Sequence, residues 1–191
     1  PEIHDLARSV LAYERATVQR FEPLLHLTSG GVRIRCHGDF NLKQALWTGK
    51  DFVLVDVDGG SDRALSERRR KRSPLRDVSS MMLSFYYAAE TALLEGVVRE
   101  ADVPVAEPWA QVWYSWVSAI FVHGYLDTAR DAAFLPSDPE SLAMQLERYV
   151  LARAFRQLGW ELSVPSERAA IPLRIIARMM SVPRESQLPR A

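Results

Sequence analysis

Residues 37–44 of this chain read HGDFNLKQ, and residues 56–59, at the end of a hydrophobic run, read DVDG. Between them, residues 48–51 (TGKD) have the composition of a hairpin turn. The pattern predicts two short strands, at 44–47 and 52–55. A polar loop precedes the first strand, and two carboxylates come directly after the second. A loop and a strand end arranged in this way can face each other across a narrow cleft.

The polar residues of these segments are of the types that phosphoryl transfer requires. A carboxylate at Asp39 can accept the proton of a hydroxyl as it attacks phosphorus. Mg²⁺ prefers oxygen ligands, usually one or two carboxylates with phosphates and waters, so Gln44 and Asp56 are candidate ligands. Asp58 either shares this metal or bonds locally. Taken singly, Asp39 is also an ordinary turn residue and Asp56 an ordinary strand-end cap; their common spacing favours a phosphoryl-transfer site.

The composition is that of a soluble globular domain. The 191 residues are 48% hydrophobic and 25% charged, and 24 Lys and Arg balance 24 Asp and Glu. A net charge of zero gives no global basic field for nucleic acid or a membrane, and no apolar run reaches the ~20 residues of a membrane span. Cys36 is the single cysteine, which excludes an internal disulfide and favours a reducing, cytoplasmic location. We therefore expect no nucleic-acid or membrane partner.

The chain before the polar loop reads as a helix and a strand. Apolar residues recur every three or four positions from 3 to 24, which predicts one long amphipathic helix disturbed in its last turn by Pro23. Residues 32–36 alternate in polarity as a strand does. The polar stretch at 58–73 has no apolar period and is expected to form a surface loop or a short helix.

After Pro74 the pattern is helical throughout. Pro104 and Pro108 separate the first two helices, and Asp138 is suited to cap the third. The helices are expected at about 78–94, 109–125, 139–154 and 166–180. The sequence therefore predicts a single α+β domain that is mainly α-helical, with a small β-ribbon carrying the polar loop.

The 37–44 and 56–59 segments resemble the catalytic loop and metal motif of the aminoglycoside-phosphotransferase-like kinases, which have a protein-kinase-like fold. Gln44 stands where most of these kinases have Asn, and in this the chain is similar to the maltokinases. Further segments that resemble maltokinases are DFVLVD at 51–56, LSERRRK at 65–71, SPLRDV at 73–78, FVHGYLDTA at 121–129 and IPLR at 171–174. The resemblance extends from about residue 33 to residue 176.

The resemblance implies that residues 1–191 form the C-terminal lobe of a kinase-like fold. The catalytic loop would lie at 37–44, the metal motif at 56–59 and a helical subdomain at 74–181. The N-terminal nucleotide lobe of the same polypeptide is missing from this chain, which begins with Pro1 rather than Met. We therefore expect a longer parent protein, and an isolated fragment that is inactive.

The implied activity is ATP-dependent phosphorylation of a sugar, with maltose converted to maltose 1-phosphate in trehalose and glycogen metabolism. Asp39 would be the catalytic base, and Gln44, Asp56 and Asp58 would hold Mg²⁺. Some relatives are fused to trehalose synthase, which makes that enzyme an expected partner by fusion or complex.

The sequence departs from the maltokinase pattern at a few positions. Lys43 stands where Gly is usual, and Asp58 replaces the more usual Glu. These departures leave the acceptor sugar open, with glucosamine as the alternative. A different class also stays open, a non-catalytic module that binds a sugar or a partner enzyme.

Three further features surround the predicted site. His37 is expected to brace the loop backbone rather than to act in catalysis. Asp77 matches the position at which kinase-like folds place an aspartate that accepts hydrogen bonds from the catalytic-loop backbone. The basic run at 68–72 has three interpretations: a solvated surface, a nucleic-acid contact, which the neutral total charge disfavours, or a segment ordered near the phosphates, with Arg68 as the candidate contact.

The aromatic residues have two interpretations. Trp109, Trp113 and Trp116 recur at helical spacing, which is typical of a buried core. Because sugar rings stack on aromatic side chains and their hydroxyls bind carboxylates, three other residues are the candidate sugar contacts: Tyr125, Trp160 and Glu161.

Overall fold

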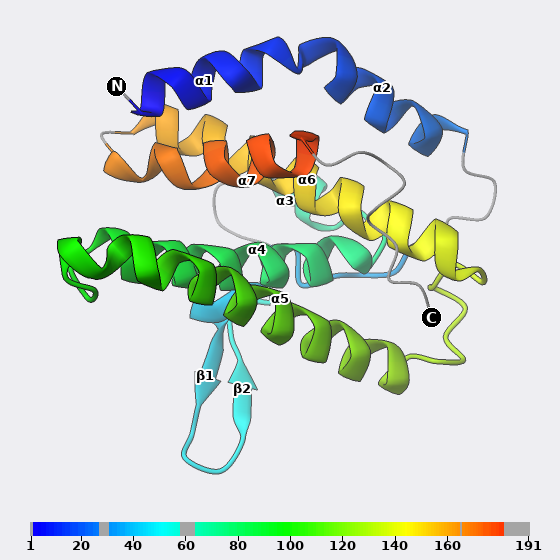
Figure 1. Ribbon diagram of the computed structural model, residues 1–191. Coiled ribbons are helices and arrows are strands. Elements are labelled where there is room, and N and C mark those ends of the chain that lie inside the picture. Colours follow the sequence, from blue (N-terminus) through cyan, green and yellow to red (C-terminus); the bar gives the residue numbers. More distant parts are fainter. Residues whose placement is uncertain (1, 27–30, 58–63, 165, 182–191) are drawn as a thin grey trace. The chain divides into compact units, whose positions relative to one another are not determined.

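The computed structural model describes residues 2–26, 31–57, 64–164 and 166–181. Most of these residues lie in helices, and the described part contains one two-stranded antiparallel sheet (Figure 1). This confirms the prediction of a mainly helical α+β chain. The chain divides into two compact units, one formed by 1–29 with 138–191 and the other by 30–137.

The first unit is entirely helical in its described part. Its elements are α1 (Glu2–Ala12), α2 (Glu14–Leu25), α6 (Pro139–Ser163), the 3₁₀ turn η3 (Glu167–Ala169) and α7 (Ala170–Ser181). The expectation of one long helix over 3–24 was wrong, because the chain breaks at Tyr13. The backbone N–H of Tyr13 bonds to the carbonyl of Val10, three residues back, which tightens the end of α1 into a turn. Pro23 lies inside α2.

The core of the first unit is formed by apolar side chains of α1, α6, η3 and α7. α7 packs on α1 and α6, and α2 packs on α6. Asp138 caps α6 as expected, since its side chain accepts a hydrogen bond from the N–H of Ser141 and Pro139 follows in the first turn. The buried apolar side chains of these helices include Val10, Leu146, Val150, Leu151, Ala154, Ile171, Ile175 and Ile176.

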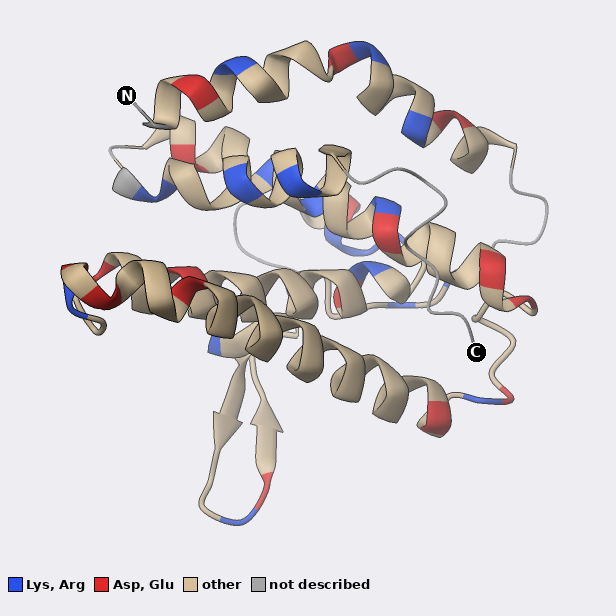
Figure 2. Ribbon diagram, viewed as in Figure 1, with Lys and Arg blue, Asp and Glu red and all other residues tan. Residues whose placement is uncertain are grey.

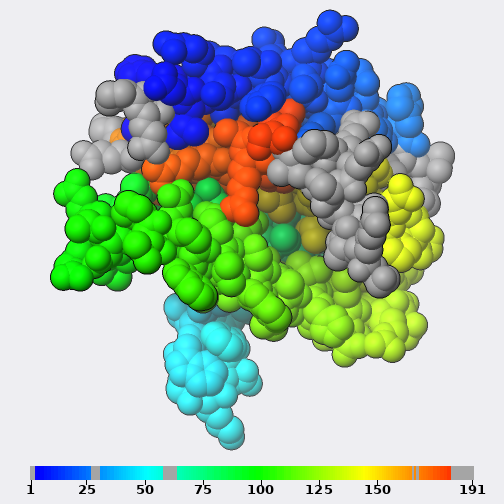
Figure 3. Space-filling model, viewed as in Figure 1, coloured from blue at the N-terminus to red at the C-terminus, as the bar shows by residue number. Residues whose placement is uncertain are grey.

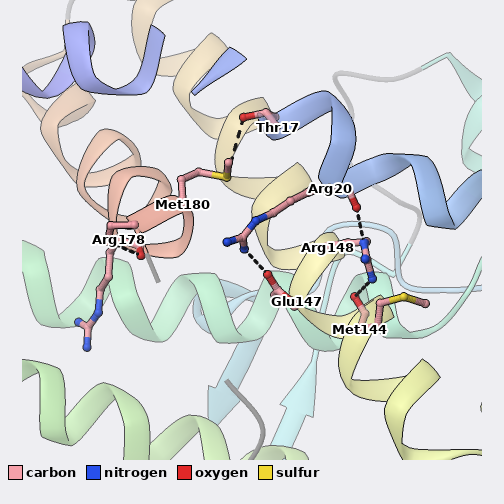
Figure 4. Close-up of polar contacts among 8 residues, drawn as sticks. Thr17, Arg20, Met144, Glu147, Arg148, Arg178 and Met180 are labelled. Carbon is pink, nitrogen blue, oxygen red and sulfur yellow. Dashed lines mark hydrogen bonds and ion pairs between the residues drawn. The ribbon is translucent and has the colours of Figure 1, made fainter. Parts of the chain in front are cut away.

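A polar cluster joins α2 to α6 (Figure 4). Arg20, which is 9% exposed, forms an ion pair with Glu147, 2.5 Å between Nη1 and Oε1. The Nε–H of Arg148 donates to the backbone carbonyl of Arg20, and its Nη1 donates to the carbonyl of Met144. Because the Arg148 guanidinium donates to a backbone carbonyl of α2 and Arg20 pairs with Glu147 of α6, charge-assisted hydrogen bonds hold the two helices together.

We expect Glu147→Ala to lower the free energy of unfolding by about 1–3 kcal/mol, since it leaves the nearly buried Arg20 guanidinium without its carboxylate. The matched control is Arg8→Ala, which removes an exposed pair with Asp5 and should cost less than about 0.5 kcal/mol. Chemical denaturation of the two variants measures both values. Equal losses in the two variants would contradict a structural role for the α2–α6 pair.

The second unit contains the two-stranded sheet and two long helices, α4 and α5, that pack on each other. Its elements are η1 (Leu42–Gln44), β1 (Ala45–Trp47), β2 (Phe52–Leu54), α3 (Leu65–Arg68), α4 (Leu75–Leu94), η2 (Glu100–Asp102) and α5 (Val103–Thr128). The predicted hairpin is confirmed: β1 and β2 pair antiparallel, and the N–H of Thr48 bonds to the carbonyl of Asp51 across the turn. The hairpin stands out from its unit, in cyan in Figure 3.

Two other predictions for this unit were wrong. Residues 32–36 form no strand; a single antiparallel bridge joins Ile34 to Arg72, and one bridge is too short to extend a sheet. α5 begins at Val103 and contains both Pro104 and Pro108. Pro104 lies in the first turn, where a missing N–H costs nothing, so this proline starts the helix instead of ending it.

The tryptophan stripe of α5 is on the surface, so its assignment to the core was wrong. Trp109, Trp113 and Trp116 are 70%, 45% and 67% exposed. α4 instead contacts the neighbouring face of α5, which carries Tyr114 and Phe121. The ring of Tyr114 lies 5.2 Å from that of Tyr86, that of Phe121 lies 5.6 Å from that of Phe85, and Gln111 donates to the buried Glu90. Figure 2 shows α5 uncharged over most of its length.

Candidate functional site

The carboxylate of Asp77, near the start of α4, holds the beginning of the 37–44 loop. Its Oδ2 accepts the backbone N–H of His37 at 2.7 Å, and its Oδ1 accepts that of Gly38 at 2.9 Å. Gly38 has a φ of 89°, a conformation that favours glycine. Burial raises the pKa of Asp77, an effect that the two N–H groups partly offset. The loop is thus fixed to α4 through both oxygens of one side chain.

The imidazole of His37 fixes the same loop to the end of the hairpin. Its Nε2 lies 2.8 Å from the backbone carbonyl of Val55. Because a carbonyl only accepts, Nε2 carries the proton, and Nδ1 is left to accept the N–H of Asp39 at 3.4 Å. The ring also lies 5.5 Å from that of Phe40. With both ring nitrogens bonded to backbone, His37 braces the loop.

Asn41 orders the loop beside Asp39, and the sequence analysis did not single it out. Its Nδ2 donates to the backbone carbonyl of Asp39 at 2.8 Å and lies 3.5 Å from the Asp39 Oδ2. Its Oδ1 caps η1 by accepting the N–H of Lys43. The signal was present in the sequence, since Asn is a preferred N-cap. Ser84 was also missed; its hydroxyl accepts the N–H of Leu42 at 3.1 Å.

The structure brings Gln44 and Asp56 to the base of the hairpin. The N–H of Val55 bonds to the carbonyl of Gln44 at 3.0 Å, which sets Gln44 beside the residue that precedes Asp56. Asp56 has a φ of 55°, in the left-handed region that Asp adopts more readily than most residues other than glycine. Its carboxylate is exposed. The open end of the β1–β2 hairpin, opposite its turn, therefore carries all three predicted residues: Asp39, Gln44 and Asp56.

The donor set at this end of the hairpin is hard and oxygen-based. A carboxylate and an amide oxygen suit Mg²⁺, which commonly takes one or two carboxylates and fills its other positions with phosphates and waters. Within the described residues no group of three or more His, Cys, Asp or Glu side chains is arranged to hold a metal. A cation held here by Gln44 and Asp56 would therefore need further oxygen ligands, such as those of a bound phosphate or water. Asp58 lies outside the described residues.

The other predicted residues fall in two places. Tyr125, on α5, is half-buried, and burial together with nearby Cys36 and Asp77 raises its pKa. Arg68 ends α3 and is half-buried. Trp160 and Glu161 belong to α6 in the first unit, where Trp160 is 56% exposed and Glu161 only 3%. The Glu161 carboxylate accepts from the Gln157 amide at 3.0 Å and from the Ser166 hydroxyl, so it is already engaged by neighbouring side chains.

Comparison with known proteins identifies the fold. No protein-family model matches this chain. A glucosamine kinase in crystal form B matches with a TM-score of 0.74 and 20% identity over 93% of this chain and 44% of that chain. A glucosamine kinase in complex with glucosamine, ADP and inorganic phosphate matches with a TM-score of 0.72 and 19% identity over 93% and 45% of the two chains. The backbone fold of this chain is therefore similar to part of the glucosamine kinase fold.

The chain spans less than half the length of the glucosamine kinase chains that it matches. At this level of identity the likeness concerns the backbone arrangement alone. Among the described residues, no helix is both long enough and apolar enough to cross a membrane.

Proposed function

We propose that this chain is the catalytic lobe of an ATP-dependent sugar kinase. The observation that carries the proposal is the way in which the 37–44 loop is held. Asp77 accepts the backbone N–H groups of His37 and Gly38, and the His37 ring bonds to the carbonyl at the end of the hairpin. Asp39 and Asp56 come directly after these two fixed segments. A sugar-kinase fold over 93% of the chain supports it. The chemistry of phosphoryl transfer depends on positioning and charge neutralisation, and this arrangement serves both.

Each residue has a proposed role. Asp39 orients the acceptor hydroxyl and takes its proton, and Asn41 holds the Asp39 backbone in place. Gln44, Asp56 and Asp58 would hold Mg²⁺, which supplies charge neutralisation on the nucleotide phosphates when bound. His37 and Asp77 act on the loop backbone alone.

The acceptor is proposed to be maltose, with maltose 1-phosphate as the product. The SPLRDV segment at 73–78 and the amide at Gln44 support this choice, because both resemble the maltokinases. Glucosamine is the second candidate, and the fold likeness to glucosamine kinases is consistent with it. Tyr125 on α5 stays a proposed sugar contact, and Arg68 a proposed phosphate contact. Trp160, exposed on α6, stays a separate candidate for the sugar. The Glu161 carboxylate is buried and engaged by Gln157 and Ser166, which argues against its proposed contact.

The proposal includes a nucleotide lobe on the same polypeptide. Kinase-like enzymes hold ATP between two lobes, and a lysine and a cover loop come from the other lobe. We therefore propose that the 191 residues alone turn over negligibly, and that the parent acts in trehalose and glycogen metabolism with trehalose synthase as a fused or bound partner.

The acceptor is tested by ADP release from the natural polypeptide with Mg-ATP and, in turn, maltose, glucosamine, glucose and trehalose. We expect kcat/KM to be highest for maltose by at least tenfold, a preference of about 1.4 kcal/mol in transition-state binding. A preference for glucosamine would keep the mechanism and replace the acceptor. Absence of turnover with every sugar would favour the non-catalytic binding module instead.

A further inference from the structure

The bridge between Ile34 and Arg72 gathers a strongly basic surface, of which the proposed kinase roles use Arg68 alone. Each of these two residues donates its backbone N–H to the carbonyl of the other, at 3.0 and 2.8 Å. The bridge therefore sets residues 33–35 antiparallel to residues 71–73. We call residues 33–35 and 68–72 together the basic ribbon.

The basic ribbon holds seven of the chain's 24 Lys and Arg residues, two in 33–35 and five in 68–72. Within its two segments there is no carboxylate, and Glu67, next to them, pairs with Arg72 at 3.0 Å. The remaining exposed cations make no ion pair with any described residue: Arg33, Arg35, Arg69, Arg70 and Lys71. Such a concentration is unexpected in a chain with a net charge of zero.

The register of the bridge adds a direct conflict of charge. Arg35 and Lys71 are the residues that flank the Ile34–Arg72 bridge on its two segments, so their backbones lie near each other. Neighbouring like charges repel each other, and an anion bound between them removes that cost.

The basic ribbon is also connected to the loop of the proposed site at both ends. Its first segment runs on through Cys36 into His37, and its second runs through Pro74 into the first turn of α4, where Asp77 holds the loop. The Cys36 thiol lies 3.5 Å from the backbone carbonyls of Ile34 and Arg72. A ligand that draws the two segments together therefore acts on the backbone that carries Asp39.

We propose that the basic ribbon binds a phosphate-bearing ligand between Arg35 and Lys71. Six of its seven cations are Arg, whose planar guanidinium makes paired hydrogen bonds to phosphate oxygens. Two sources of phosphate suit the site: the polyphosphate chain of a nucleotide and the phosphate of a sugar monophosphate. The binding stands whether or not the chain is a kinase, because it rests on the bridge and its charges alone.

The test is the melting temperature of the natural polypeptide in buffer of low ionic strength, where exposed charges are weakly screened. Tripolyphosphate at about ten times its Kd should raise Tm by about 3–6 °C. Arg35→Gln should raise Tm in the absence of any phosphate, since it removes one of two neighbouring like charges, and should abolish most of the increase with tripolyphosphate. Arg130→Gln, an exposed cation of the same unit that pairs with Asp127, is the control and should keep the full increase.

Separate titrations with metal-free ATP and with glucose 1-phosphate identify the source, because only the ligand that fits should lose its effect in Arg35→Gln. Two results would overturn the proposal. One is an equal rise in Tm with sodium chloride at matched ionic strength, which would mean screening without a site. The other is an undiminished response to every phosphate in both Arg35→Gln and Lys71→Gln. Loss of sugar phosphorylation alone would count against the kinase proposal and leave this one intact.

Discussion

Asp39→Asn is expected to lower kcat of the natural polypeptide by about 10²- to 10⁴-fold, the usual effect of removing a general base. The amide keeps the size of the side chain and can still accept a hydrogen bond, so the loop should stay folded. It cannot take the proton of the acceptor hydroxyl. KM for ATP should change little, because Asp39 is proposed to act on the acceptor rather than on the nucleotide.

The matched control for this variant is Asp51→Asn, at the far end of the same hairpin, in the turn. It changes one exposed carboxylate by the same chemistry and should keep kcat within about twofold, because it lies outside the proposed machinery. Steady-state rates of ADP release measure both variants. An Asp39→Asn enzyme within a few-fold of the wild-type rate would remove Asp39 from the role of base.

Asp77→Asn should have the second-largest effect, although Asp77 is proposed to touch neither substrate. Its two oxygens accept two separate N–H groups, at 2.7 and 2.9 Å. The Asn side chain keeps one acceptor oxygen but presents an NH₂ donor to the other backbone N–H. One of the two loop N–H groups therefore loses its hydrogen-bond partner. We expect the free energy of unfolding to fall by about 1–3 kcal/mol, and kcat to fall by about 10²-fold through misplacement of Asp39.

Asp102→Asn supplies the comparison for Asp77→Asn. Asp102 is a partly exposed carboxylate of the same unit that pairs with Arg99, and its loss should cost less than about 0.5 kcal/mol with no change in rate. A positioning role for Asp77 requires kcat to fall while KM for ATP stays near the wild-type value. A variant that loses stability but keeps its full kcat in the folded fraction would reduce Asp77 to a purely structural residue.

The parts of the fold that were predictable from the sequence are those fixed by nearby residues. The hairpin follows from two short apolar runs around TGKD, and its turn bonds, between Thr48 and Asp51, are local. The α6 cap follows from Asp138 and the proline after it. Such features need no knowledge of what lies across the fold.

The parts that were not predictable depend on distant contacts. Helical spacing shows that Trp109, Trp113 and Trp116 share a face, but it does not show that α4 packs on the neighbouring face, through Tyr114 and Phe121. The alternation at 32–36 shows a preference for extended backbone, while the length of its pairing depends on a segment more than thirty residues further on.

The candidate site divides in the same way. Asp39, Gln44 and Asp56 stand out by residue type and spacing, because reactive and metal-binding groups must be of a few kinds. Asn41 and Ser84 do not, because they act through single hydrogen bonds to backbone that only the folded chain reveals. The positive φ of Asp56 is likewise visible only in the structure.

The central claim is phosphoryl transfer from ATP to a sugar, and ³¹P NMR of the natural polypeptide with Mg-ATP and maltose tests it most directly. The proposal predicts that the γ-phosphate signal of ATP declines while a sugar phosphate signal rises in equal amount, with ADP as the other product. The appearance of inorganic phosphate in place of a sugar phosphate, with maltose and with glucosamine alike, would contradict it.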